Sequence, residues 1–86
     1  MIIAENIIDL IGKTPMIRIN STNSNSATIY AKLEWYNIGG SVKDGMALYI
    51  LENAEKAGKL KKEKTILEAT SGNTGIALAM LATVKG

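Results

Sequence analysis

A lysine beside two glycines is the first residue of this sequence whose position could support chemistry. Lys43 follows the loop Asn37-Ile38-Gly39-Gly40 and lies where the pattern predicts the first turn of a helix. The positive end of a helix dipole disfavours a second positive charge, so the neutral form of the Lys43 amine is favoured there. A neutral amine is the nucleophile that forms an imine with an aldehyde. An ordinary surface lysine at a helix start is the alternative.

A second loop–helix junction, Thr70-Ser71-Gly72-Asn73-Thr74-Gly75, is made of small and polar residues. It offers hydroxyl groups, a side-chain amide and the backbone N–H groups of a helix N-terminus. This set suits an anion such as a carboxylate or a phosphate. The residues alone leave open an ordinary N-cap turn whose polar groups serve only their own helix.

The elements that must position these junctions follow from hydrophobic periodicity and from turn residues. In chain order the pattern predicts a short helix over Asn6–Ile11, a β-hairpin of Met16–Ile19 with Ala27–Leu33, a helix from Val42 to Gly58, a strand over Thr65–Ala69 and a buried helix over Ile76–Val84. The polar stretch at 20–26 would form the hairpin loop. A strand, a turn of small residues and a helix in succession indicate an α/β arrangement.

Two details of the first long helix can be predicted. Ser41 followed three residues later by Asp44 resembles a capping box, with Asp in place of Glu. Its apolar stripe is expected to face the core; the stripe consists of Met46, Ile50, Ala54 and Ala57, with Ala47 and Leu51 beside it.

Composition excludes several classes of site. The 86 residues contain neither cysteine nor histidine, which removes disulfides, thiolate and Ser-His nucleophiles, and the usual zinc ligands, so no metal site is expected. No signal peptide is visible, and the longest apolar stretch, 76–82, is far shorter than the roughly 18 residues of a membrane span. A cytoplasmic protein without nucleic-acid or membrane partners is therefore expected. The lysine cluster at 59–64 is interpreted as a solvated turn, because no arginines or aromatic residues are interleaved with it.

Four motifs occur together in an order and spacing that resemble one enzyme family. They are Ile11-Gly12-Lys13-Thr14-Pro15-Met16-Ile17-Arg18, Ala31-Lys32-Leu33-Glu34, Gly39-Gly40-Ser41-Val42-Lys43-Asp44 and Thr70-Ser71-Gly72-Asn73-Thr74-Gly75. The chain resembles the N-terminal part of the cysteine synthase and cystathionine β-synthase family, pyridoxal-phosphate enzymes of fold type II. The resemblance implies an α/β fragment of that fold, with a β-hairpin followed by helix, strand and helix.

The resemblance also assigns roles to individual residues. Lys43 matches the lysine that binds pyridoxal 5'-phosphate as an imine and moves the substrate's α-proton. Asn73 matches the residue that hydrogen-bonds the ring hydroxyl of the cofactor. The loop that binds the substrate carboxylate corresponds to Thr70, Ser71, Gly72, Asn73 and Thr74. The cofactor would act as an electron sink while the protein supplies orientation.

For the full-length form, the resemblance implies β-replacement of an activated serine by sulfide to give cysteine. Residues 1–86 would be a partial N-terminal region of a two-domain, homodimeric enzyme whose phosphate-binding loop lies outside them. The isolated chain is expected to be inactive. Fragments of cystathionine β-synthase or of a serine/threonine dehydratase are alternatives, as is a non-catalytic remnant that acts as a folding or binding unit.

Two departures from the family pattern bear on the helix that carries Lys43. The family usually has Pro where this chain has Ile38, and Arg where it has Gly45. Glycine in a helix costs up to ~1 kcal/mol relative to a good helix former, so we expect this helix to be less firmly placed. In a chain of this length, the hairpin residues Ile17, Ile19, Ile29 and Ala31 are expected to face water or a partner chain, with the 76–84 helix incompletely covered.

Overall fold

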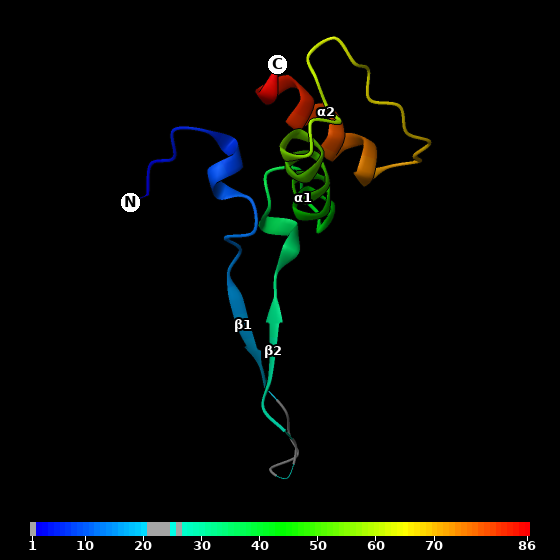
Figure 1. Cartoon of the computed structure of the whole chain (residues 1–86). Coiled ribbons are helices and arrows are strands. Elements are labelled where there is room, and N and C mark those ends of the chain that lie inside the picture. The colour runs from blue at the N-terminus through cyan, green and yellow to red at the C-terminus, as the bar shows by residue number, and fades with distance from the viewer. Residues whose placement is uncertain (1, 21–24, 26) are drawn as a thin grey trace.

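The computed structural model describes residues 2–20, 25 and 27–86, and it forms a helix pair from which a hairpin projects. In chain order its elements are a 3₁₀ turn η1 (Ile7–Leu10), strands β1 (Met16–Ile19) and β2 (Ile29–Lys32), a 3₁₀ turn η2 (Glu34–Tyr36), and helices α1 (Lys43–Lys56) and α2 (Asn73–Lys85). The principal extents are 57 × 33 × 23 Å, because the hairpin points away from the helices (Figure 1).

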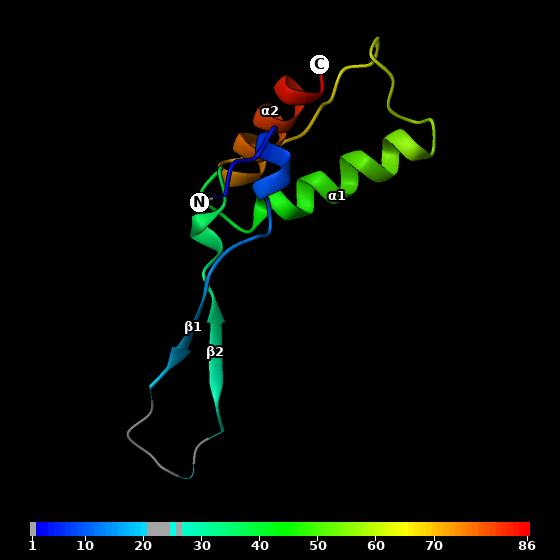
Figure 2. The same cartoon turned by 90° about the vertical axis from the view of Figure 1, so that its left-hand side faces the viewer.

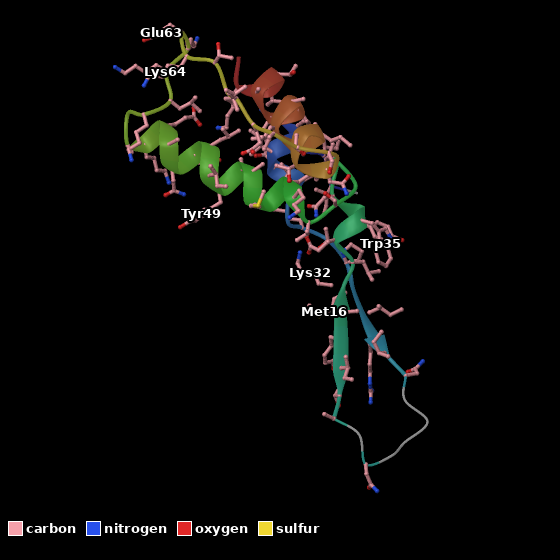
Figure 3. All side chains as sticks on the ribbon, turned by 90° about the vertical axis from the view of Figure 1, so that its right-hand side faces the viewer. Met16, Lys32, Trp35, Tyr49, Glu63 and Lys64 are labelled. Carbon is pink, nitrogen blue, oxygen red and sulfur yellow. The ribbon has the colours of Figure 1, made fainter. Side chains whose placement is uncertain are left out.

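The predicted hairpin is confirmed, with β1 and β2 antiparallel and Met16 opposite Lys32 at one end and Ile19 opposite Ile29 at the other. Most of its predicted loop lies outside the described residues. Ile17, Ile19 and Ile29 are about half exposed, as expected, and Ala31 is half-buried. Figure 3 shows Met16 and Lys32 on a ribbon with no element packed against it. A two-stranded hairpin is marginally stable on its own, so its position relative to the helices depends on the contacts at its root.

The helix α1 ends as the sequence predicts. Gly58 has a φ of 73°, the left-handed conformation that glycine adopts readily, and the N–H of Lys59 donates to the carbonyl of Ala54 at 2.9 Å. This closing turn reverses the chain, which then returns along the helices through residues 59–72 to the start of α2 (Figure 2).

The two helices pack against each other with their N-termini at the same end. An ion pair joins Glu55 Oε1 to Lys85 Nζ at 2.6 Å, near the C-terminal ends of α1 and α2. One and two turns before it, the buried core consists of Leu51 and Ala47 from α1 and Leu81 and Ala77 from α2. This core and the ion pair join α1 to α2, and the two helices begin at the same end of the pair (Figures 2 and 3).

The predicted core stripe of α1 is wrong by one position. Ala47 and Leu51 are buried, whereas Met46 and Ile50 are exposed, Ile50 by 54%. The reason is that α2 covers only the side of α1 that carries residues 47 and 51. The apolar helix α2 is likewise buried only at Ala77 and Leu81, and Ile76 is about half exposed, so its expected incomplete covering is confirmed.

The strand predicted over Thr65–Ala69 does not form. This segment has no ladder partner, since the one sheet in the described part of the chain is the β1–β2 hairpin. An extended run becomes a strand only when another strand pairs with its backbone. All five residues are exposed, and Leu67 is 94% exposed, so the apolar character that suggested a buried strand is left without a neighbour.

Candidate active site

Lys43 is the first residue of α1, as the sequence predicts, and its side chain is half-buried. Its backbone N–H donates to Ser41 Oγ at 3.2 Å. The predicted capping box is nevertheless wrong in its second half, because the Asp44 carboxylate accepts from the N–H of Gly39 at 2.5 Å instead of from Ser41. The short Asp side chain at this position reaches the glycine loop that precedes the helix.

Asp44 is fully buried, and its approach to the loop requires a glycine. A Cβ atom at position 39 would lie 2.2 Å from Asp44 Oδ1 and 2.9 Å from Oδ2, well inside contact distance. Asp44 Oδ1 has no hydrogen-bond partner among the described residues. The Gly39-Gly40 pair therefore does more than make the loop flexible, because Gly39 admits a carboxylate against the backbone.

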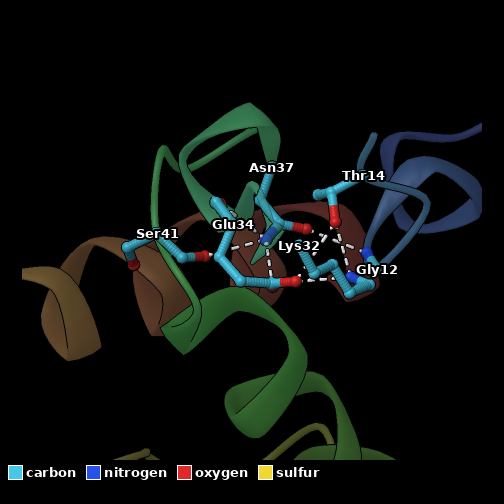
Figure 4. A network of polar contacts seen from close by, with 6 residues as sticks. All are labelled: Gly12, Thr14, Lys32, Glu34, Asn37 and Ser41. Atoms are coloured by element: carbon cyan, nitrogen blue, oxygen red, sulfur yellow. Dashed lines mark hydrogen bonds and ion pairs between the residues drawn. The ribbon is translucent and has the colours of Figure 1, made fainter. Parts of the chain in front are cut away.

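A second buried polar side chain, Asn37, begins this loop (Figure 4). Its Oδ1 accepts from the N–H of Gly12 at 2.9 Å. Its Nδ2 lies within donor range of three oxygens: the carbonyl of Glu34 at 2.8 Å, Glu34 Oε2 at 2.9 Å and the carbonyl of Ser41 at 3.1 Å. One amide thus joins the N-terminal segment, the end of the hairpin and the loop that leads to Lys43.

The same network extends to the root of the hairpin. Lys32 Nζ at the end of β2 pairs with Glu34 Oε1 and donates to Thr14 Oγ1 at 2.5 Å, while Thr14 Oγ1 donates to Glu34 Oε1 at 3.1 Å. The hydrogen bond from Lys32, followed by that from Asn37, lowers the pKa of Glu34 below its ordinary value. Glu34 therefore stays ionised at neutral pH, which keeps its oxygens available as acceptors.

The Thr70–Thr74 loop lies immediately before and within the first turn of α2, which begins at Asn73. Thr70 Oγ1 accepts from the N–H groups of Gly75 at 3.1 Å and Gly72 at 3.3 Å. A Cβ at Gly75 would lie 2.6 Å from Thr70 Cγ2, so this glycine lets the threonine close the turn. The backbone N–H groups of Asn73 and Thr74 have no partner within the described residues, and Ser71, Gly72 and Asn73 are exposed.

The packing of the two helices leaves both predicted junctions at one end of the molecule. Lys43 is the first residue of α1 and Asn73 is the first residue of α2. Figures 2 and 3 show both helix N-termini at the same end of the pair. One N-terminus carries a primary amine and the other carries unpaired N–H donors, and these are the groups that bind an aldehyde and an anion respectively.

Two hollows in the surface differ in their relation to this site. The larger, about 420 Å³, lies at the C-terminal ends of the helices, where Leu51, Glu55 and Lys85 line it. It contains none of the predicted site residues. The smaller, about 250 Å³, is lined by Thr70 and Gly75 together with apolar residues of α2. Of the two, only the smaller hollow contains a predicted site residue, Thr70, and Lys43 lines neither.

The sequence did not reveal that Asn37 and Asp44 would be the buried polar residues on either side of the loop. The signal for Asn37 was its place before a glycine-rich turn, and that for Asp44 was a carboxylate in a first helical turn. Exposed residues commonly occupy both kinds of position, so neither signal predicts burial.

The described part of the chain contains no group of three or more acidic, cysteine or histidine side chains that could hold a metal ion. None of its helices has the length and apolar character of a membrane span.

Comparison with known proteins identifies close relatives. The chain is 52% identical over 87 aligned positions to cystathionine beta-synthase of Mus musculus, a match that covers 98% of this chain and 16% of the mouse protein. It is 51% identical over 83 positions to cysteine synthase of Staphylococcus aureus, covering 95% of this chain and 27% of that enzyme. The chain thus spans about a quarter or less of the length of these relatives.

Solved structures agree with the predicted fold class. A hydrogen sulfide-producing enzyme of Fusobacterium nucleatum superposes with a TM-score of 0.86 at 50% identity, over 99% of this chain and 28% of that one. An O-acetylserine dependent cystathionine beta-synthase of Helicobacter pylori gives a TM-score of 0.84 at 43% identity, over 96% and 28%. The chain has the α/β fold of the N-terminal portion of fold type II enzymes.

The family itself is shown by a match along nearly the whole chain. Residues 7–86 fit the model of the family described as pyridoxal-phosphate dependent enzyme. That family uses pyridoxal phosphate, the cofactor predicted from the motifs. The chain therefore belongs to the pyridoxal-phosphate-dependent enzymes.

Proposed function

We propose that these 86 residues are the N-terminal region of a cysteine synthase-like enzyme that replaces the β-substituent of an activated serine by sulfide. The observation that carries this proposal is that Lys43 and the Thr70–Thr74 loop both lie at the N-terminal end of the packed helix pair. Support comes from relatives at 51–52% identity whose names are cysteine synthase and cystathionine beta-synthase. The full-length form would bind an amino-acid substrate and assemble as a homodimer.

The residues present fit pyridoxal phosphate in their chemistry. Lys43 supplies a primary amine whose side chain is half-buried at the start of α1. The first turn of α2 supplies N–H groups that no side chain or carbonyl of the described chain occupies. When bound, the cofactor withdraws electrons from the α-carbon of an attached amino acid, so that its proton and its β-substituent can leave.

Each residue of the site would have a separate task. Lys43 Nζ would hold the cofactor covalently and later take the proton from the substrate α-carbon. The Asn73 side chain would orient the cofactor ring through its hydroxyl. The backbone N–H groups of Asn73 and Thr74, with the Ser71 hydroxyl, would bind the substrate carboxylate. Thr70 would act on the loop itself, since its hydroxyl already accepts from Gly72 and Gly75.

We further propose that the cofactor site is shared between this N-terminal region and a later part of the full-length chain. Residues 1–86 would be a partial N-terminal region of a two-domain enzyme, with the loop that holds the cofactor phosphate in the later part. The coverage of 27–28% of the cysteine synthase of Staphylococcus aureus and of the solved structures supports this division. By itself the 86-residue chain would bind the cofactor weakly and make no cysteine from an activated serine and sulfide.

A cystathionine β-synthase is the second candidate, because the mouse enzyme of that name is as similar to this chain as the bacterial cysteine synthases are. The two differ in the product that their names state, cystathionine in one case and cysteine in the other. Product analysis of a longer chain that contains these residues, supplied with an activated serine and with either sulfide or an amino-acid thiol, separates them.

The test of the proposal is chemical trapping of Lys43. The protein is mixed with pyridoxal phosphate, reduced with borohydride and mapped by mass spectrometry, with Lys56 at the far end of α1 as the internal reference. We expect preferential labelling of Lys43 and its loss, with the loss of imine absorbance, in Lys43→Ala. Lys56→Ala is the matched control and should leave both unchanged. Equal labelling of Lys43 and Lys56 would contradict the assignment.

A further inference from the structure

We infer that Asn37 and Asp44 are positioning residues that clamp the loop between them, residues 38–43, so that Lys43 is held toward the Thr70–Thr74 loop. This inference rests on the proposed function of Lys43 and adds to it the means by which the amine is placed before the cofactor binds. Asn37 and Asp44 are the buried polar side chains of the described chain, with exposures of 4% and 0%. They lie at opposite ends of the same loop.

The loop needs such a clamp because its own residues do not fix it. Gly40 has a φ of 80°, a conformation that glycine accepts without strain, and two adjacent glycines give the unfolded loop many alternatives. Val42, the residue just before α1, has no side-chain hydrogen bond that caps the helix. Two short-range bonds occur in this segment, from the N–H of Gly40 to the carbonyl of Asn37 at 2.8 Å and from the N–H of Lys43 to Ser41 Oγ at 3.2 Å, and neither ties the loop to the rest of the molecule.

Asn37 anchors the start of the loop to two other parts of the molecule. It accepts from Gly12, donates toward Glu34 and reaches across the loop to the carbonyl of Ser41, two residues before Lys43 (Figure 4). A buried amide that uses both its oxygen and its nitrogen in this way fixes the distance between the segments that it joins. The start and the end of the loop are thus connected by one side chain.

Asp44 anchors the end of the loop from the opposite side. Its Oδ2 accepts from the N–H of Gly39 at 2.5 Å, a charge-assisted bond across the loop to the residue that leaves it room. Asp44 directly follows Lys43 in the chain, so the bond from its carboxylate to Gly39 holds the backbone that carries the Lys43 side chain. Its second oxygen has no partner in the described chain, which is costly for stability and points to a role in placement.

The experiment compares four variants of the protein: Asp44→Ala, Asp44→Asn, Asn37→Ala and Asn53→Ala. Asp44→Asn retains an oxygen that can accept from Gly39. Asn53→Ala is the matched control, since it removes an exposed amide that donates to the Tyr49 carbonyl at 2.7 Å elsewhere on α1. The first readout is hydrogen exchange of the Gly39 amide and of the core amides of Leu51 and Leu81. The second is the ratio of borohydride-trapped pyridoxal phosphate at Lys43 to that at Lys56, measured across pH.

Asp44→Ala should speed Gly39 exchange by about tenfold or more, as expected for the loss of a hydrogen bond to a charged group. It should also lower the Lys43-to-Lys56 ratio and alter its pH profile, while the Leu51 and Leu81 amides keep their protection. Asn37→Ala should lower the ratio as well. Asp44→Asn should restore much of the native exchange and labelling, and Asn53→Ala should change neither.

The outcomes separate this inference from the function on which it rests. Preferential labelling of Lys43 that persists in Asp44→Ala and Asn37→Ala would overturn the clamp while supporting the function. Absence of preferential labelling in the native protein would count against the function, and Gly39 exchange would still test the clamp. If Asp44→Ala also loses core protection, Asp44→Asn decides: an intact core with native Gly39 exchange and labelling supports the clamp, and loss of both overturns it.

Discussion

The close approach of Gly39 and Asp44 makes Gly39→Ala the sharpest single test of the loop. The new Cβ would lie 2.2 Å from Asp44 Oδ1, and the carboxylate is fully buried on an ordered helix, so it cannot turn away into solvent. Either the loop moves or the bond from the Gly39 N–H to Asp44 is lost. Overpacking costs about 1–3 kcal/mol and loss of a bond to a charged group costs about 1.5–3 kcal/mol, so the two estimates overlap at about 1.5–3 kcal/mol.

The assay is urea unfolding followed by the helical circular dichroism signal, with Gly45→Ala as the matched control. Gly45 lies within α1, and a Cβ there meets nothing within 4 Å. Alanine at 45 should therefore stabilise the helix by up to about 1 kcal/mol. The same Gly→Ala substitution is thus expected to lower stability at position 39 and to raise it at position 45. Because small domains have only a few kcal/mol of stability, the Gly39→Ala loss would be a large shift of the midpoint. A Gly39→Ala protein as stable as the native one would refute the reasoning.

Three further predictions concern the core, the network and the loop. Leu81→Ala removes the largest buried apolar side chain and should cost about 2–5 kcal/mol in the same unfolding assay, whereas an effect below that range would mean that the helix pair is not the core. The pKa of Glu34 is lowered in the folded state, so its ionised carboxylate stabilises the fold at pH values above the ordinary glutamate pKa, about 4.3. This stabilisation is lost as pH falls through the lower folded pKa. Glu34→Gln should flatten the stability–pH curve in this acidic range, and an unchanged curve would contradict the reasoning. In a longer chain that binds substrate, Ser71→Ala should weaken amino-acid binding by about 1.5–3 kcal/mol and more than it weakens cofactor binding, whereas Asn73→Ala should weaken cofactor binding, as spectral titration would show.

Local signals in the sequence were enough to predict most elements and both junctions. The polar stretch between two alternating runs predicts the hairpin, Gly58 predicts the end of α1, and the small-residue turn predicts the start of α2. These features depend on residues close together in the chain. The family resemblance was confirmed for the same reason, because its motifs are short and lie at these turns.

What the sequence could not predict depends on contacts between distant residues. The predicted core face of α1 differs from the observed one by one residue, because the stripe with Met46 and Ile50 and the stripe with Ala47 and Leu51 are both apolar. Which of the two is buried depends on the position of α2. The Thr65–Ala69 segment has the residues of a strand, but a ladder requires a partner backbone. Asp44 was expected to cap its own helix, and its reach to Gly39 depends on a loop conformation that no local pattern encodes.

The parallel course of α1 and α2 has a consequence for how this segment tolerates changes in length. The return connection over residues 57–72 contains sixteen residues, whereas an extended chain covers the roughly 21 Å length of a 14-residue helix in about six or seven. The surplus includes the exposed lysines at 61, 62 and 64, so insertions or deletions there leave the spacing of Lys43 and Asn73 intact. A single residue inserted between Lys43 and Ala47 has the opposite effect, because it turns Lys43 by about 100° relative to the packed face and away from the Thr70–Thr74 loop. We therefore expect changes in length to be tolerated in the return connection and not between Lys43 and Ala47.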